Sequence, residues 1–168
     1  MSKDTYPITA AVRVLRAQKV PFTPCLYTYE EHGGTTVSAR ELGAPEHNVI
    51  KTLVMENDEK KPLIVLMHGD CEVSTKQLAR LLHVKTIHPC AHDVAEKHTG
   101  YQIGGTSPFG MRKTLPVYME RSIADLPTIY INGGKRGFLV AMATADLIRV
   151  LRPTLVEVAV ESNTHGKD

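Results

Sequence analysis

Hydrophobic residues recur along the chain at two spacings, one typical of helices and one typical of strands. Apolar residues three or four positions apart predict helices, and short alternating or continuous apolar runs predict strands. The helical segments are Ile8–Gln18, Thr36–Leu42, Ser74–Leu82, Ala91–His98 and Thr144–Leu151. The strand segments are Leu26–Tyr29, Val49–Glu56, Leu63–Met67, Val84–Ile87, Val117–Glu120, Thr128–Asn132, Phe138–Met142 and Leu155–Val160. Because the two kinds are interspersed irregularly, with hairpin-like neighbours, we expect an α+β domain with a mixed sheet.

Polar residues and glycines mark several ends of these segments. Ser74 begins a capping-box pattern, and Thr36 and Thr144 are each expected to cap the helix that they begin. Gly43 is expected to end the helix that begins at Thr36. A turn at residues 57–59 joins two of the strands into a predicted hairpin.

Length and composition indicate a single domain over residues 1–168, with the polar residues 161–168 as a frayed tail. No apolar run approaches the length of a membrane span, and the first residues lack the apolar stretch of a signal peptide. Three cysteines at unrelated spacings do not make a disulfide framework. We therefore expect a protein of the reducing cytoplasm.

The net charge of only +2 argues against a protein that holds DNA or another duplex by bulk charge. Aromatic residues make up 5% of the chain and tryptophan is absent, so a platform that stacks single-stranded bases is not expected. The charge remains compatible with a small enzyme that touches one end of an RNA.

Lys51 is the first candidate for chemistry. It lies inside the apolar run Val49–Met55, and strand alternation places it on one face with Val49 and Leu53. One interpretation is an edge-strand lysine that extends to solvent, a common protection against edge-to-edge pairing. The other is a cation that lines a pocket and lies close to a carboxyl or phosphate group. The sequence leaves both open.

The stretch 100–110 is too polar and too rich in glycine for the core, and it is the second candidate. Gly104 and Gly105 permit backbone conformations closed to other residues, and Pro108 stiffens the loop. We expect the backbone N–H groups of Gly104, Gly105 and Thr106 to stabilise negative charge on a carbonyl oxygen. The plain alternative is a long connecting turn.

Two familiar glycine motifs do not describe this loop. No Lys-Ser or Lys-Thr pair follows the glycines, which excludes a phosphate-binding loop. Proline follows Ser107 and the second glycine of a serine-hydrolase elbow is missing, so Ser107 is a poor candidate for a nucleophile.

A second glycine turn, 132–137, separates two predicted strands. Its plain interpretation is a tight hairpin whose glycines supply positive φ angles. In a functional interpretation Lys135 and Arg136, with Arg112 and Lys113 after the first loop, contact a phosphate backbone.

His88, Cys90 and His92 are three possible metal ligands within five residues, but their spacing suits no standard zinc motif. The chain also contains no nicotinamide, flavin or phosphate-loop motif. We expect no metal and no cofactor.

The motifs above, taken together and in this order, resemble the YbaK family, free-standing relatives of the editing domain inserted in bacterial prolyl-tRNA synthetases. The resemblance rests on Lys51 in a strand, on the glycine loop ending at Pro108, and on Ile129–Gly137. It runs from about Ile8 to about Val160. It implies a mixed, partly curled sheet flanked by helices, and hydrolysis of mischarged aminoacyl-tRNA in trans, with Cys-tRNA(Pro) as the first candidate substrate.

The resemblance also assigns roles to residues of this chain. It implies that Lys51 is required, that the glycine loop lies against the aminoacyl ester, and that Tyr29 and Asn132 lie in or near the same pocket. It also implies prolyl-tRNA synthetase as a partner beside the acceptor end of tRNA. The expected catalytic residues are Lys51, Gly104, Gly105 and Thr106, and the expected substrate-binding residues are Tyr29, Thr36, Ser107, Pro108, Asn132, Gly133, Lys135 and Arg136.

The chain departs from better-known members at the amino-acid pocket. An expected aromatic residue is replaced by Thr36 or Val37, and an aspartate of some members is Leu139 here. The amino acid removed therefore stays open between cysteine, alanine and serine. A module that binds a tRNA end or a synthetase without cleaving anything is the alternative from another class.

Overall fold

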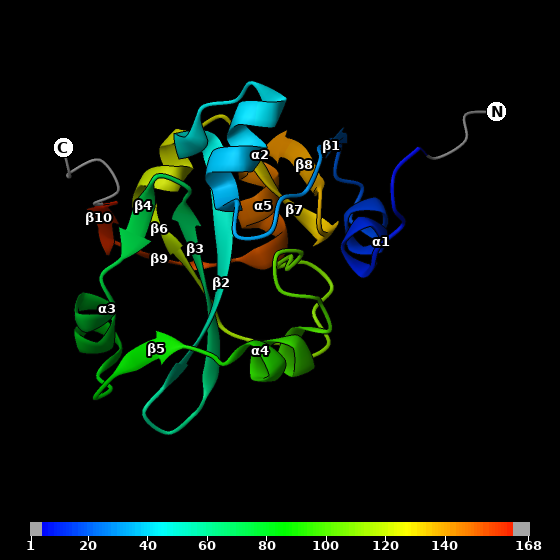
Figure 1. Cartoon of the computed structure of the whole chain (residues 1–168). Helices are drawn as coiled ribbons and strands as arrows, with labels where there is room; N and C mark the ends of the chain where they lie inside the picture. The colour runs from blue at the N-terminus through cyan, green and yellow to red at the C-terminus, as the bar shows by residue number, and fades with distance from the viewer. Residues whose placement is uncertain (1–4, 163–168) are drawn as a thin grey trace.

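The computed structural model describes residues 5–162, in which eight strands form one mixed sheet (Figure 1). The strand order is β1-β8-β7-β2-β3-β6-β9, and β5 pairs with β2 beside that path. The strands are β1 (Phe22–Leu26), β2 (Val49–Asn57), β3 (Pro62–His68), β5 (Ile87–Pro89), β6 (Val117–Glu120), β7 (Thr128–Lys135), β8 (Phe138–Ala143) and β9 (Thr154–Val156). A second, two-stranded sheet pairs β4 (Cys71–Val73) with β10 (Ala159–Glu161).

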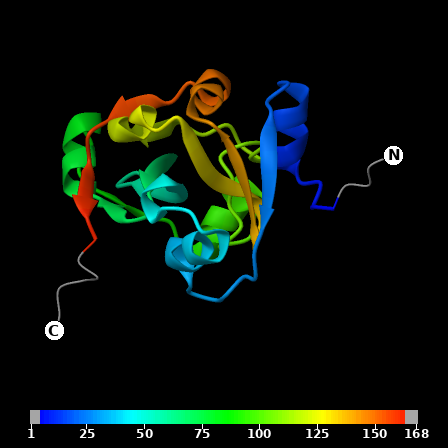
Figure 2. The same ribbon diagram turned by 90° about the horizontal axis from the view of Figure 1, so that it is seen from above.

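The large sheet contains both parallel and antiparallel pairs. The pairs β2–β7, β3–β6 and β6–β9 are parallel, whereas β1–β8, β7–β8, β2–β3 and β2–β5 are antiparallel. The predicted α+β fold with a mixed sheet is confirmed. Figure 2 shows that β10 and the N-terminal helix lie at opposite sides of the molecule.

Five α-helices flank the strands within residues 5–162, and their ends show which capping predictions hold. They are α1 (Ala10–Ala17), α2 (Gly34–Leu42), α3 (Thr75–Leu82), α4 (His92–Thr99) and α5 (Thr144–Leu151), with short 3-10 helices η1 (Glu46–Asn48) and η2 (Arg121–Asp125). Ser74 caps α3 by accepting a hydrogen bond from the Gln77 amide, as predicted. Gly43 ends α2 in the left-handed conformation, also as predicted. None of the helices in the described part of the chain is both long and apolar enough to cross a membrane.

Two of the capping predictions are wrong. Gly33 occupies the N-cap of α2, which places Thr36 within the first turn of the helix. Ala143 occupies the N-cap of α5, and Thr144 is the first helical residue. Helix α2 therefore begins two residues before Thr36, and α5 begins at Thr144 itself, one residue after its cap.

Three strand predictions are also corrected. The strand predicted at Leu26–Tyr29 lies earlier, at Phe22–Leu26. Its Pro24 is tolerated because β1 is an edge strand, which among the described strands pairs with β8 alone. The short strand predicted at Val84–Ile87 begins only at Ile87. The strand predicted at Leu155–Val160 is two strands in different sheets.

The break between β9 and β10 has a specific cause. The carboxylate of Glu120, at the end of β6, accepts hydrogen bonds from the amides of Val158 and Ala159 at 2.8 and 2.9 Å. These amides are satisfied by a side chain instead of a neighbouring strand, so the chain turns there and changes sheet. Glu161 ends β10, and residues 163–168 of the predicted tail lie outside the described residues.

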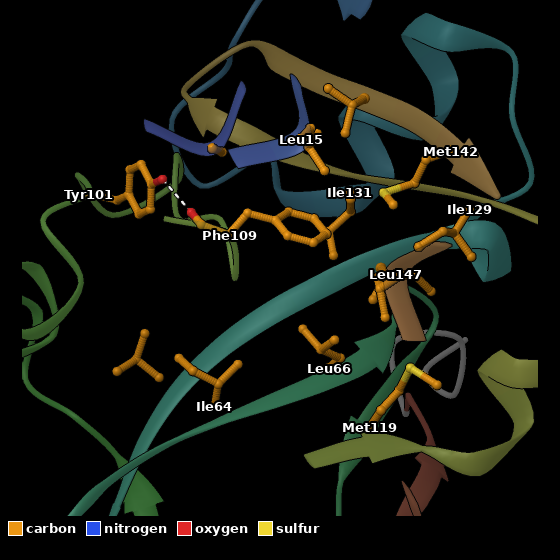
Figure 3. Close-up of a cluster of buried hydrophobic side chains, with 14 of the residues drawn as sticks. Leu15, Ile64, Leu66, Tyr101, Phe109, Met119, Ile129, Ile131, Met142 and Leu147 are labelled. Atoms are coloured by element: carbon orange, nitrogen blue, oxygen red, sulfur yellow. Dashed lines mark hydrogen bonds between the residues drawn. The ribbon is translucent and has the colours of Figure 1, made fainter. Parts of the chain in front are cut away.

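The hydrophobic core covers both faces of the central strands. Ile64 and Leu66 of β3 join the cluster drawn in Figure 3, while Leu63, Val65 and Met67 of the same strand belong to a cluster on the opposite face. In the first cluster the Tyr101 hydroxyl donates to the Phe109 carbonyl at 2.5 Å. Strands β2 and β3 are therefore central, with residues buried on either side.

The sheet is open along one stretch of β2. On the side away from β3, residues Val49 and Ile50 pair with β7, and residues Met55 to Asn57 pair with β5. The intervening residues 51–54 have no strand neighbour on that side within the described chain. The two neighbours diverge here, and this gap positions the site described next.

Candidate functional site

A cavity of about 600 Å³ lies at the gap in the sheet. Residues 51–54 of β2 form one wall, and α2 with the segment before it, the start of α4, the first glycine loop and the β7–β8 turn form the others. Segments far apart in sequence therefore meet around one space. Of the expected site residues, Tyr29, Lys51, Gly104, Thr106, Asn132 and Arg136 line it.

Lys51 lies on a central strand, so the edge-lysine interpretation does not apply. Its side chain is half-buried, and its ammonium donates a hydrogen bond to the backbone carbonyl of Cys71. Burial lowers the pKa of Lys51, and the nearby carboxylates of Glu72 and Glu46 act in the opposite direction. The side chain is thus a tethered cation at the cavity wall.

The first glycine loop approaches the cavity through Gly104. This residue has a φ of +87°, and a Cβ atom placed on it would lie 2.6 Å from the Tyr29 hydroxyl oxygen. Both the backbone conformation and the contact therefore require glycine. The ring of Tyr29 is in turn covered by the guanidinium of Arg136, 5.0 Å from the ring centre.

Side chains from three elements hold the loop in place. Asn132 of β7 donates to the Gly104 carbonyl at 3.2 Å, and the Arg136 Nε donates to the Ile103 carbonyl at 2.8 Å. Glu96 of α4 accepts from the Ile103 amide at 2.9 Å. The second glycine turn thus supports the first, a relation that sequence reasoning did not anticipate.

The amide groups of the loop differ in availability. The N–H of Gly105 donates to the Gln102 carbonyl at 2.8 Å, so it is engaged within the loop. The N–H groups of Gly104 and Thr106 have no hydrogen-bond partner among residues 5–162, and both residues line the cavity. Two amides, in place of the three expected, can therefore face a ligand.

Other expected site residues lie outside the cavity lining. Ser107 is fully buried, and its Oγ accepts from the Phe109 amide at 3.1 Å, which makes it a turn-forming residue. Thr36 is exposed and donates to Glu46 at 3.1 Å, while its neighbour Thr35 lines the cavity. The expected residues that the structure does not bring to the lining are Thr36, Gly105, Ser107, Pro108, Gly133 and Lys135.

Several lining residues carried no signal that sequence reasoning used. Glu96 and His92 lie on α4, where the pattern of polar residues is typical of a solvent-exposed helix face. Tyr27 lies two residues before Tyr29, a spacing that puts both side chains on one face of an extended segment. This spacing was the one sequence signal that could have placed Tyr27 in the cavity wall. Val37 and Leu139, the two departures from the family pattern, both line the cavity and are almost fully buried.

The family model for the aminoacyl-tRNA editing domain matches residues 30–150, the part of the chain that holds most of this cavity. The chain belongs to the aminoacyl-tRNA editing domain family. The resemblance to the YbaK family is thereby confirmed.

Relatives of this editing domain occur both as free-standing proteins and within synthetases. The chain is 28% identical over 160 residues to the "Putative Cys-tRNA(Pro)/Cys-tRNA(Cys) deacylase EbsC" of Enterococcus faecalis, covering 95% of this chain and 98% of that protein. It is 25% identical over 88 residues to the proline–tRNA ligase of Brachyspira hyodysenteriae, covering 52% of this chain and 15% of the ligase.

Solved structures show the same fold. One described as a "putative trans-editing enzyme for prolyl tRNA synthetase" superposes with a TM-score of 0.77 at 18% identity, covering 95% of this chain and 99% of the other. A hypothetical protein superposes with a TM-score of 0.81 at 17% identity, covering 90% and 99%. At these identities the likeness concerns the fold alone.

Proposed function

We propose that this editing domain hydrolyses the ester bond of mischarged aminoacyl-tRNA in trans, in the cytoplasm, with Cys-tRNA(Pro) as its first substrate. The observation that carries the proposal is that the Lys51 ammonium and the Gly104 loop line one cavity. A volume of about 600 Å³ falls within the range of small-molecule sites and has room for an aminoacylated terminal nucleoside. The family and the printed name of the Enterococcus relative support the same reaction.

The proposed chemistry depends on charge stabilisation. The amides of Gly104 and Thr106 would donate to the ester carbonyl oxygen as it becomes an oxyanion. Lys51, tethered to the Cys71 carbonyl, would hold the terminal phosphate or the carbonyl in position. Water or the substrate's own thiol would attack the ester carbon, the bond from that carbon to the ribose oxygen would break, and the nucleophile's proton would pass to the ribose oxygen. The acyl group would leave as the free amino acid after attack by water, or as a cyclic thioester after attack by the thiol.

The lining of the pocket favours a substrate amino acid with a small, weakly polar side chain. Val37 and Leu139 present apolar surface to the cavity. Moving a hydroxyl from water to such a surface without a hydrogen bond costs about 1–3 kcal/mol, so serine is disfavoured relative to cysteine or alanine. A separate editing site is also expected on physical grounds. The amino-acid pocket of a synthetase reaches a selectivity of only about 10- to 200-fold between side chains that differ by one methylene.

A panel of mischarged tRNAs tests the proposal. Purified protein is mixed with radiolabelled Cys-, Ala- and Ser-tRNA(Pro), and release of each amino acid is followed over time. We expect fastest release of cysteine and slowest release of serine. Binding of all three without release would instead support the non-catalytic module.

We further propose prolyl-tRNA synthetase as the partner that supplies tRNA selectivity. The net charge of +2 gives little non-specific affinity for RNA. Adding the synthetase should therefore lower the KM for Cys-tRNA(Pro) more than it changes kcat. Equal kinetics with and without the synthetase would contradict this part of the proposal.

A further inference from the structure

Three side chains of metal-ligand type meet next to Lys51, outside the cavity lining. They are His47 of η1, Asp70 of the turn after β3, and Cys71, which begins β4. The Nδ1 of His47 lies 2.9 Å from one carboxylate oxygen of Asp70, and the Cys71 Sγ lies 3.6 Å from that oxygen. All three donor atoms lie within 4.8 Å of one another.

The two separations that involve Asp70 are close to those of a tetrahedral zinc site, and the third, between His47 and Cys71, is within 4.8 Å. Bonds of about 2.0–2.3 Å at tetrahedral angles put neighbouring ligand atoms roughly 3.3–3.7 Å apart. The Cys71–Asp70 distance already falls in that range, and the His47–Asp70 distance needs to widen by only a few tenths of an ångström. One nitrogen, one oxygen and one thiol sulfur form a donor set that suits Zn²⁺ better than Mg²⁺ or Ca²⁺.

The ligands are held by well-packed neighbours. The ring of His47 stacks on that of the fully buried His68, with centroids 3.7 Å apart and planes 7° apart, and His68 Nδ1 donates to the His47 carbonyl at 2.7 Å. The turn that carries Asp70 is pressed against η1, because a Cβ on Gly69 would lie 2.7 Å from the Glu46 carbonyl oxygen. Both segments are therefore fixed relative to each other.

Charge and exposure favour a cation at this place. The carboxylates of Glu46, Asp70 and Glu72 surround the single ammonium of Lys51, which leaves the neighbourhood negative. The side chains of His47 and Asp70 are 46% and 44% exposed. An ion held by three protein ligands would therefore keep a fourth, solvent-facing position for water.

We propose that His47, Asp70 and Cys71 form a Zn²⁺-binding site. The sequence predicted no metal, because these ligands are not close together along the chain. His88, Cys90 and His92 do not gather into a ligand group in the described part of the chain, whereas His47 and Asp70 meet across 23 residues.

Cobalt spectroscopy tests the site. Co²⁺ is titrated into the metal-free full-length protein, and we expect intense visible bands of tetrahedral cobalt with a thiolate-to-cobalt charge-transfer band. Cys71→Ser should abolish the charge-transfer band, while Cys25→Ser, a matched control at another partly buried free cysteine, should keep it. Absence of the band in the parent protein, or its persistence in Cys71→Ser, would overturn the proposal.

Thiol alkylation gives a second measurement that does not require a folded cysteine variant. Zn²⁺ should slow alkylation of Cys71 at least about tenfold in the parent protein, as followed by mass spectrometry, and should leave Cys25 unchanged. Asp70→Asn should remove the protection. Equal alkylation rates of Cys71 with and without Zn²⁺ would overturn the site, and no step depends on aminoacyl-tRNA or on the proposed deacylation.

Discussion

Lys51 places a half-buried ammonium between the cavity and the Cys71 carbonyl. If this cation positions the substrate, Lys51→Ala should lower kcat/KM for Cys-tRNA(Pro) by roughly 100-fold or more while leaving the circular dichroism spectrum unchanged. Lys61→Ala is the control, because that side chain is 73% exposed on the β2–β3 turn. Deacylation by Lys51→Ala at the parent rate would contradict the assignment.

Gly104 offers a second test at a single position. Gly104→Ala should lower deacylation by roughly 100-fold, because the methyl group would push on the Tyr29 hydroxyl and displace the loop amides. Gly43 is a matched control, since it also has positive φ but open space around its Cβ position. Both variants should lose about 1 kcal/mol of stability in urea unfolding, and only Gly104→Ala should lose activity. Parallel activity losses in the two variants would point to general destabilisation instead.

At the scale of elements, the two glycine-rich segments act as one unit. Asn132 accepts from the amides of Gly134 and Lys135 and also donates to the Gly104 carbonyl, so one side chain shapes the second turn and holds the first loop. The sequence predicted both segments but not their contact. Local composition predicts where a chain turns, whereas the pairing of β7 beside β2 brings the two turns together.

Asn132→Asp separates these two roles. The carboxylate keeps the two acceptor bonds of the turn but loses the amide donor to Gly104. We expect kcat to fall about 10- to 100-fold with less than about 2 kcal/mol of lost stability. Asn48→Asp removes a similar amide–carbonyl bond, to Thr128, away from the loop, and should leave kcat unchanged. An unchanged kcat in Asn132→Asp would show that the loop does not need this anchor.

At the scale of the whole molecule, a chain of polar groups crosses the fold. His68 of β3 lies 2.7 Å from Ser122 Oγ through its Nε2 and bonds the His47 carbonyl through its Nδ1. The backbone amide of Ser122 donates to one carboxylate oxygen of Glu120, and the other oxygen accepts from the amide of Val158 between β9 and β10. The core therefore contains an ionisable ring that is linked to η1 on one side and to η2 on the other.

This arrangement predicts a loss of stability in mild acid. Burial, with the nearby ring of His47, lowers the pKa of His68, and the hydrogen bond to the His47 carbonyl, together with Asp70 and Glu120, opposes that shift only in part. Below the unfolded pKa of about 6.5, the unfolded chain binds a proton that the folded protein does not. The free energy of unfolding in urea should therefore fall between pH 7 and pH 5, by at most about 1.4 kcal/mol per pH unit from this residue.

Two variants connect the slope to His68. His68→Gln should flatten the pH dependence, even where it lowers stability at every pH. His32→Gln should leave the slope unchanged, because the His32 side chain is 89% exposed. The same slope in all three proteins would show that another group is responsible.

The sequence by itself was sufficient for the types of most elements, for the family and for the first two candidate features. Capping and hydrophobic spacing both depend on the nearest residues, and Ser74, Gly43 and the strand at Val117–Glu120 were predicted correctly for that reason. Where pairing decided the outcome, local patterns failed, as at Pro24 in an edge strand and at the divided strand near Val158.

Only the tertiary structure decided how the candidate residues lie relative to each other. The gap beside residues 51–54 exists because β2 changes neighbours from β7 to β5, and no local pattern encodes such a change. It brings Lys51 to the same cavity as Gly104, while packing buries Ser107 and engages the Gly105 amide. Long-range pairing and burial, which depend on every strand at once, select which residues of a motif can meet a ligand.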